Sequence, residues 1–219
     1  MPVEVRRLGL TGLLVDCGDE RTRRRVVAGL TARPVAGVIE VVPAAVTVGL
    51  GLDPGADPAT VARAVLGLPL SEGEVGSEVG VESEVDVEEP LQVPVLYDGA
   101  DLGEVASLVG LTPAALIDWH TGQTWTCDFT GFLPGFGYLV GESSLVVPRR
   151  ATPRTRIPAG SVALAGEWCG VYPGASPGGW QLIGRTPWAF FDPSRAQAAL
   201  LRAGTRVRFR AVTEGEWPR

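Results

Sequence analysis

The chain has 219 residues, of which 45% are hydrophobic and 20% are charged, and its formal net charge is −6. This composition predicts a soluble, globular protein with enough residues to bury a core in one or two domains. No run of about 18 apolar residues occurs, so no membrane span is expected, and the acids near the N-terminus argue against a signal peptide.

The negative charge is concentrated in one segment. Residues 71–90 carry eight acids and no base, so the rest of the chain has a balance of +2. This segment has little apolar mass to order it, and we interpret it as a solvated linker or an insertion. The overall charge therefore predicts nothing about a binding face elsewhere.

The chain contains no lysine, so arginine supplies all 19 strongly basic side chains. A Walker P-loop, a biotin carrier and a pyridoxal phosphate enzyme each require a lysine, so these three classes are excluded. Any phosphate or carboxylate would be bound by arginine, by backbone N–H groups or by hydroxyls.

The three cysteines, Cys17, Cys127 and Cys169, lie far apart in the sequence. Their odd number and wide spacing favour a reducing compartment over a disulfide framework or a zinc site. We interpret them as small apolar core residues and expect a cytoplasmic protein.

Residues 1–70 have the pattern of a small α+β domain, in which short strands alternate with amphipathic helices. The expected elements are a strand at 3–15, a helix at 18–32, two short strands in 37–50 joined at Pro43 and Ala44, and a helix at 59–68.

From Val93 onward the pattern changes to short strands separated by Gly and Pro, which predicts a β-barrel or sandwich. Two helices are expected within 101–122, the second opening at Thr112 with Pro113 as its first residue. The expected strands are 93–98, 124–129, 135–140, 161–172, 179–186, 189–192 and 205–212. In the last of them Val207 and Phe209 should face inward and the intervening arginines outward.

The segment GFLPGFGYL (131–139) combines three glycines and a proline with aromatic residues. Its spacing is not that of a GxGxxG phosphate loop. Two interpretations stay open: a barrel corner whose aromatic side chains fill the core, or a corner whose backbone N–H groups face a ligand. The binding candidates here are Gly135, Phe136, Gly137 and Tyr138.

His120 is the single histidine and ends the second predicted helix of this region. A lone histidine is more often a hydrogen-bonded structural residue than a general base. Its ordinary pKa nevertheless suits proton transfer, so it remains a candidate for that role.

Pro148–Pro187 is rich in Gly and Pro, which impose particular backbone conformations. Pro153 and Pro158 restrain the chain around Arg154 and Arg156, and preorganised guanidinium groups suit a carboxylate or phosphate. The alternative is an exposed basic loop.

Within this stretch, SPGGWQLIGRT (176–186) places Gly178 and Gly179 before Trp180 and Gln181. Adjacent glycines permit close approach of a ligand, and Gln181 can both donate and accept hydrogen bonds, as an amide or lactam substrate requires. The alternative is a β-turn that packs Trp180 against the barrel. The remaining predicted binding residues of the stretch are Ser161, Tyr172 and Arg185.

Several long motifs occur in order across residues 93–219. They are VPVLYDGADLGEVA (93–106), GFLPGFGYL (131–139), PRRATPRTRIPAGSVALAG (148–166), YPGASPGGWQLIGRTP (172–187) and GTRVRF (204–209). With these motifs the chain resembles the family of the 5-oxoprolinase B subunit, also called allophanate hydrolase subunit 1 or KipI-like proteins. Residues 1–70 resemble the family's N-terminal domain more loosely, and residues 71–90 depart from it.

The resemblance implies an α+β protein: a small α+β domain at 1–70, a linker or insertion at 71–92, and a cyclophilin-like β-barrel at 93–219. It implies a component of a hydrolase that opens 5-oxoproline to L-glutamate with ATP, together with a homologous C subunit (allophanate hydrolase subunit 2-like) and a separate A subunit. The ATP site, with its Mg²⁺, would lie on this chain or on a partner. No covalent cofactor, protein-bound metal, nucleic acid or membrane is expected.

On the matching positions, Arg154 and Arg156 would hold a phosphate or carboxylate, and Gln181 with the two glycines would hold the lactam. His120, Arg154 and Gln181 are the expected catalytic residues. Two alternatives stay open: a KipI-like regulator that binds and inhibits a sensor histidine kinase, and a carboxyltransferase-type component of a urea carboxylase or allophanate hydrolase system, with biotin delivered on another chain.

Overall fold

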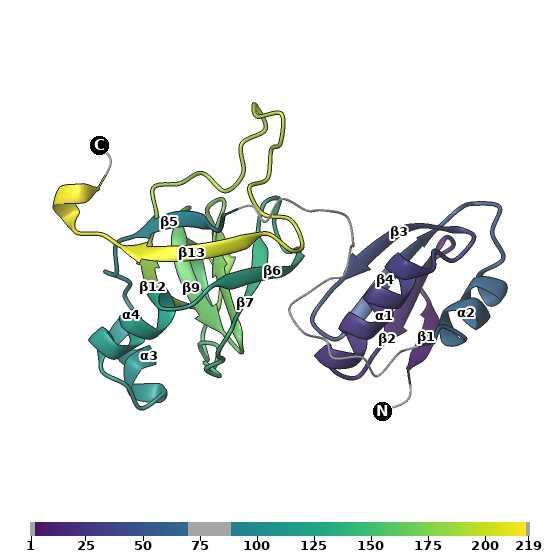
Figure 1. The fold of residues 1–219 in the computed structure, drawn as a ribbon, viewed down its shortest axis with the longest axis horizontal. Coiled ribbons are helices and arrows are strands. Elements are labelled where there is room, and N and C mark those ends of the chain that lie inside the picture. The colour runs from purple at the N-terminus through teal and green to yellow at the C-terminus, as the bar shows by residue number, and fades with distance from the viewer. Residues whose placement is uncertain (1–2, 70–88, 218–219) are drawn as a thin grey trace. The chain divides into compact units, whose positions relative to one another are not determined.

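The computed structural model describes residues 3–69 and 89–217 (Figure 1). The chain divides into two compact units, Met1–Val85 and Asp86–Arg219. The predicted acidic linker falls almost entirely outside the described residues. The second unit's first strand begins at Leu91, two residues before the predicted start of the barrel.

The first unit is a four-stranded antiparallel sheet in the order β1-β2-β4-β3, covered by two helices. Helix α1 contacts β3 and β4, whereas α2 contacts β1 and β2. Their shared core includes Leu13, Val15, Val26, Leu50 and Val61. The elements are β1 (Glu4–Arg7), β2 (Gly12–Asp16), α1 (Glu20–Ala32), β3 (Val38–Pro43), β4 (Thr47–Leu52) and α2 (Pro58–Leu66).

The two helices of this unit begin where local chemistry predicts. The Asp19 carboxylate accepts a hydrogen bond from the Thr22 backbone N–H, and Asp57 caps α2 in the same way, followed by Pro58. The single strand expected over 3–15 is wrong, because the chain turns through Gly9, at φ 67°, and returns as a second strand.

The second unit is a seven-stranded sheet in the order β12-β9-β10-β7-β6-β13-β5, with a separate two-stranded sheet of β11 and β8. The strands are β5 (Leu91–Val95), β6 (Trp125–Thr130), β7 (Gly137–Gly141), β8 (Arg154–Ile157), β9 (Ser161–Ala165), β10 (Trp168–Val171), β11 (Ser176–Gly178), β12 (Gln181–Arg185) and β13 (Arg206–Ala211). The sequence pattern did not predict β8, and it predicted β11 only as part of a turn. In β13 the expected alternation is confirmed, since Val207 and Phe209 are buried.

The sheet closes into a barrel where its two edge strands meet. Just after β5, Leu96 exchanges two backbone hydrogen bonds of 2.9 Å with Arg185 of β12. Two glycines permit this approach: a Cβ atom on Gly99 would lie 2.3 Å from the Ile183 carbonyl carbon, and one on Gly184 would lie 2.6 Å from the Leu96 oxygen. The mixed fold with a nearly closed barrel confirms the predicted fold class.

Helices α3 (Leu102–Leu108) and α4 (Pro113–Thr121) contact β12 and β13 respectively (Figure 1). Thr112 caps α4 and Pro113 opens it, as predicted. Among the described residues no single helix is long and apolar enough to cross a membrane. Helices α3 and α4 reach the required length and apolar composition only when taken together, and they are bent by 89°.

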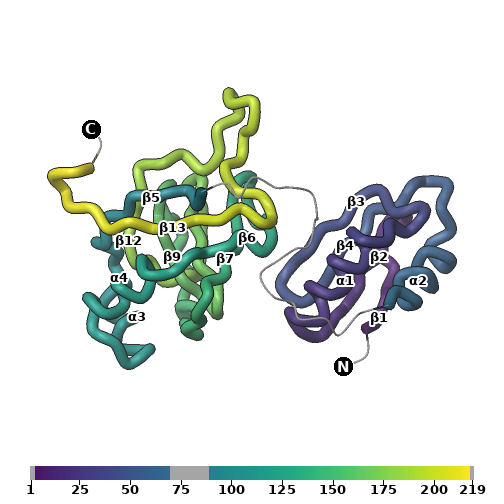
Figure 2. Tube along the Cα trace, in the orientation of Figure 1, coloured from purple at the N-terminus to yellow at the C-terminus, as the bar shows by residue number. Residues whose placement is uncertain are grey.

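The chain between β12 and β13, residues 186–205, extends beyond the sheet before it returns to the barrel (Figure 2). Phe190 and Leu201 from this connection are buried in the barrel core. A short 3-10 turn, Glu214–Glu216, follows the last strand.

Candidate functional site

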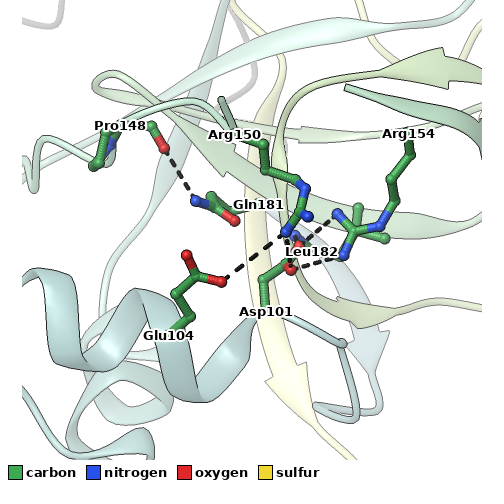
Figure 3. Close-up of polar contacts among 7 residues, drawn as sticks. All are labelled: Asp101, Glu104, Pro148, Arg150, Arg154, Gln181 and Leu182. Carbon is green, nitrogen blue, oxygen red and sulfur yellow. Dashed lines mark hydrogen bonds and ion pairs between the residues drawn. The ribbon is translucent and has the colours of Figure 1, made fainter. Parts of the chain in front are cut away.

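A buried carboxylate, Asp101, organises the arginine-rich part of the barrel (Figure 3). Its side chain is 2% exposed and accepts hydrogen bonds from both terminal nitrogens of Arg154, at 2.8 and 2.7 Å. Arg150 donates a third at 2.7 Å, and the Leu182 backbone N–H a fourth at 2.7 Å. Glu104 lies 4.0 Å from Arg150. We call Asp101, Glu104, Arg150 and Arg154 the ionic cluster.

The electrostatics of the cluster favour an ionised Asp101. Burial by itself raises the pKa of this carboxyl, but the Arg154 and Leu182 hydrogen bonds and the charges of Arg154 and Arg150 outweigh it, so the pKa lies below its ordinary value. The same hydrogen bond to Asp101 raises the pKa of Arg154. Two arginines thus face two carboxylates.

Barrel closure brings the cluster together. The hydrogen bonds from Leu96 to Arg185 continue into a bond from the Asp101 N–H to the Leu182 oxygen, 2.9 Å long. Asp101 also stands immediately before α3, yet its side chain makes no bond to that helix. An aspartate at this position ordinarily caps its own helix, so the arginines have displaced the usual local bond.

Gln181 lies beside this cluster at the start of β12 (Figure 3). Its side chain is 2% exposed, and its Nε2 donates to the Pro148 carbonyl at 3.3 Å. Its Oε1 is buried and has no hydrogen-bond partner among the described residues, and the same holds for Arg150 Nε. A buried acceptor without a partner costs about 1–3 kcal/mol, so Gln181 carries an unused hydrogen-bonding group.

A layer of packed aromatic rings forms the neighbouring part of the barrel. Phe136 lies at its centre, with ring centroids 5.2 Å from Tyr138, 5.4 Å from Tyr172 and 5.3 Å from Trp180. These contacts are edge-to-face, a favourable arrangement for aromatic pairs. We call the following residues the aromatic wall: Phe129, Phe136, Tyr138, Trp168, Tyr172 and Trp180.

Glycines let the backbone lie against this wall. A Cβ atom on Gly178 would be 2.5 Å from the Tyr172 hydroxyl, and one on Gly170 would be 2.7 Å from the Phe136 ring. The backbone of Gly179 accepts a 2.9 Å hydrogen bond from the Arg150 N–H. The glycine pair of SPGGW therefore joins the aromatic wall to the arginine-bearing segment.

The loop of GFLPGFGYL lines a shallow hollow of about 350 Å³ with Ala199 and Leu201. Phe132 at its tip is 58% exposed and holds a positive φ of 70°, a conformation that is strained for a bulky residue. Gly135, at φ 82°, packs on Phe190 and Phe191, and Gly137 packs on Cys127 and Leu201. The corner has the packed interior of the first interpretation, and the second, in which backbone N–H groups face a ligand, stays a prediction.

The structure does not place His120 with these residues. It is fully buried in the barrel core, stacked on Phe209 at 4.5 Å. Its Nδ1 is 2.7 Å from the Tyr97 hydroxyl and its Nε2 is 3.2 Å from Cys169 Sγ. Burial lowers the pKa of His120 to about 3. This environment is that of a neutral structural histidine.

Three further candidates lie outside the ionic cluster. Ser161 and Arg185 are opposite each other in the register of β9 and β12. The Ser161 hydroxyl donates to the Pro158 carbonyl at 2.8 Å, and the Arg185 side chain donates to the Asp98 carboxylate at 2.8 Å. Arg156 is exposed on β8 and makes no ion pair with the described residues. The predicted residues that the fold does gather are Phe136, Tyr138, Arg154, Tyr172, Gly178, Gly179, Trp180 and Gln181.

Sequence reasoning missed Asp101 and Glu104. Both belong to the motif VPVLYDGADLGEVA, but an acid at the start of a helix is ordinarily interpreted as a cap. The available signal was the excess of arginine without acids in PRRATPRTR, which requires a carboxylate from elsewhere in the chain if any arginine is partly buried.

Comparison with known proteins places this site in a family context. The model of the carboxyltransferase domain, subdomain C and D, matches residues 3–201. The 5-oxoprolinase B subunit of Bacillus subtilis is 46% identical over 131 residues, covering 58% of this chain and 55% of that protein. The protein of the same name from Haemophilus influenzae is 47% identical over 129 residues, covering 57% of this chain and 60% of that protein. The chain spans little more than half the length of these relatives.

Solved structures agree in fold. TTHA0988 is similar with a TM-score of 0.69 and 37% identity over 99% of this chain and 42% of its own length. PH0987 from Pyrococcus horikoshii gives a TM-score of 0.57 and 29% identity over 97% of this chain and 99% of its own length. The Kluyveromyces lactis urea carboxylase gives a TM-score of 0.72 over 98% of this chain and 22% of its own length; at 18% identity it shows likeness of fold alone.

The family match covers both units and most of the chain, and its named relatives carry the name that the motifs of residues 93–219 led us to expect. This chain belongs to the carboxyltransferase-domain family, subdomain C and D, and resembles the 5-oxoprolinase B subunit within it.

Proposed function

We propose that this chain is the B-type component of an ATP-dependent 5-oxoprolinase, which opens 5-oxoproline to L-glutamate together with a homologous C subunit and a separate A subunit. The observation that carries the proposal is the 46–47% identity to three proteins named as the B subunit of 5-oxoprolinase. Identity at this level exceeds what the fold alone requires, since the urea carboxylase shares the fold at 18%.

Gln181 and the ionic cluster have the chemistry that a lactam substrate would use. A lactam presents one N–H donor and one carbonyl acceptor. The unpartnered Gln181 Oε1 is an acceptor and the unpartnered Arg150 Nε–H is a donor. Both atoms are sealed from solvent in the unliganded chain, so their use requires movement of neighbouring side chains. We therefore assign Gln181 to lactam binding as part of the proposal.

We propose that Arg154 positions the neighbouring chain and does not contact the ligand directly. Both of its terminal nitrogens are engaged by Asp101, which is the two-point pairing that a ligand carboxylate would otherwise make. Its guanidinium holds the start of β8 against the closing segment of the barrel. The expected direct role of Arg154 in phosphate binding is thus replaced by a supporting role for the Gln181 region.

The arginines of the ionic cluster are poorly suited to bind a triphosphate. The chain has no lysine, and Arg150 and Arg154 are matched by Asp101 and Glu104. Within residues 3–69 and 89–217 no group of three or more His, Cys, Asp or Glu side chains can hold a metal ion. We propose that ATP and its Mg²⁺ bind to one of the partner proteins.

Reconstitution tests the proposed function. The chain is combined with its A and C partners, and glutamate released from 5-oxoproline is measured with and without ATP. We expect release only when all components and ATP are present. Gln181→Ala should lower the rate, whereas Gln92→Ala, at an exposed position of β5, should not. The absence of glutamate from the complete set would refute the proposed function.

The family model's name favours one second candidate, a carboxyltransferase component. Transfer of a carboxyl group from carboxybiotin to urea, measured with the same purified components, separates this candidate from the first. Carboxyl transfer without glutamate release would select it. The kinase-regulator alternative stays a prediction.

A further inference from the structure

Arg149 is the exposed member of the neighbouring pair Arg149 and Arg150. Its neighbour Arg150 turns into the ionic cluster and is 28% exposed, whereas Arg149 is exposed. No carboxylate within residues 3–69 and 89–217 lies within ion-pair distance of Arg149. The two acids of the ionic cluster match Arg150 and Arg154, whereas Arg149 has no carboxylate partner among the described residues, and the same holds for Arg156 on β8.

The backbone holds Arg149 against the glycine pair. The N–H of Arg150 donates to the Gly179 carbonyl at 2.9 Å, which ties the two segments together. Arg149 Nε lies 3.9 Å from the position that a Cβ atom on Gly179 would occupy, and Pro153 Cγ lies 3.7 Å from the same position. A methyl group at 179 would make ordinary van der Waals contact with Pro153 and with the base of this guanidinium.

The glycine pair links Arg149 to the aromatic wall, since a Cβ atom on Gly178, next to Gly179, would lie 2.5 Å from the Tyr172 hydroxyl. Burial raises the pKa of Tyr138 and of Tyr172, and the positive charge of Arg149 acts on both in the opposite direction. Both hydroxyls stay protonated at neutral pH, so they do not neutralise Arg149. Tyr138 and Trp168 of the aromatic wall are only partly buried, so part of each side chain is accessible.

We propose that Arg149 and the adjoining aromatic wall bind the carboxylate of a small, flat organic acid, with Arg149 as the residue that selects acid over amide. A planar guanidinium pairs with a carboxylate through two parallel hydrogen bonds. The single guanidinium of Arg149 suffices for this two-point pairing with a monoanion. The ring surface of Tyr138 and Trp168 would cover the body of the acid.

That the natural acid is 5-oxoproline rests on the proposed function. The existence of a site that prefers acids over amides does not rest on it. Ligand-observed NMR on the full chain measures the dissociation constants of two acid and amide pairs: 5-oxoproline with its carboxamide, and benzoate with benzamide. Fluorescence of Trp168 and Trp180 gives a second readout. We expect each bound acid to be at least tenfold tighter than its amide.

Variants assign the effect to Arg149. Arg149→Gln should weaken acid binding about tenfold and leave amide binding unchanged, and Arg149→Lys should restore part of the loss. Arg208→Gln, an exposed arginine on the outer face of β13, is the matched control and should change neither. An Arg149→Gln chain that retains the acid preference, or a wild-type chain that shows none with either pair, would overturn the inference.

The same titrations separate this inference from the proposed function. Arg149-dependent binding of benzoate without binding of 5-oxoproline would support the carboxylate site and count against 5-oxoproline as its ligand. Conversely, glutamate release by the reconstituted enzyme with an acid preference that Arg149→Gln leaves intact would support the function and overturn the role of Arg149.

Discussion

Removal of the Asp101 carboxylate should destabilise the barrel unit far more than removal of an exposed acid. Asp101→Ala leaves Arg154 unpaired, leaves Arg150 with only the 4.0 Å ion pair to Glu104, and deprives the Leu182 N–H of its acceptor. Loss of one partner of a buried ion pair costs about 3–5 kcal/mol. The lower end applies, because Arg154 and Arg150 retain 24% and 28% exposure and regain water. We expect a loss of about 3 kcal/mol.

Urea unfolding followed by tryptophan fluorescence measures this loss. All six tryptophans lie after residue 118, so the signal reports the barrel unit alone and avoids mixing the transitions of two units. With a denaturant slope of about 2 kcal/mol/M, the midpoint should fall by about 1.5 M.

The matched control is Asp98→Ala. Asp98 pairs with Arg185 at 2.8 Å, but the two side chains are 43% and 49% exposed, so the loss should stay below about 1 kcal/mol. If the alanine variant does not fold, Asp101→Asn takes its place in the measurement. This variant keeps the shape of the side chain and should still lose most of the free energy of unfolding that the carboxylate contributes. Equal midpoints for the Asp101 and Asp98 variants would refute the argument that the cluster is a buried organiser.

Buried groups in the two units lead to three further predictions. First, the His120 pKa of about 3 lies below its ordinary value of about 6.5, so between these pH values only the unfolded state takes up the proton. The free energy of unfolding should therefore fall as the pH drops below about 6.5, by up to about 1.4 kcal/mol per pH unit. His120→Gln should flatten this slope between pH 6 and 5, and an unchanged slope would contradict the prediction. Second, Gly178→Ala should cost about 1–3 kcal/mol through overlap with the Tyr172 hydroxyl, whereas Gly174→Ala, which meets no atom within 4 Å, should cost little; comparable urea midpoints would count against the tight contact. Third, burial raises the pKa of Cys17 to about 11 and of Cys127 to about 12, and Cys169 is raised as well, so no thiol should react with Ellman's reagent at pH 8 until denaturant exposes all three; rapid reaction of the native chain would show an accessible thiol.

Much of the fold could be predicted because its elements have local causes. The Thr112–Pro113 start of α4 follows from capping chemistry, and the alternation of Val207 and Phe209 with arginines follows from the pleat of a strand. The hairpin of β1 and β2 was missed because the turn between its arms depends on one glycine. Strands β8 and β11 were missed because their Pro and Arg content is that of a loop.

The sequence by itself determined the residue types available for binding: no lysine, many arginines, and a glycine pair beside Trp180 and Gln181. Only the tertiary structure decided which of them are free. Barrel closure at Leu96 and Arg185 places Asp101 against residues 49 and 53 positions away, where it engages Arg150 and Arg154 and leaves Arg149 uncompensated. It also buries His120 in the core. The physical reason is that ion pairing and burial depend on contacts between distant segments, which no local pattern in the chain encodes.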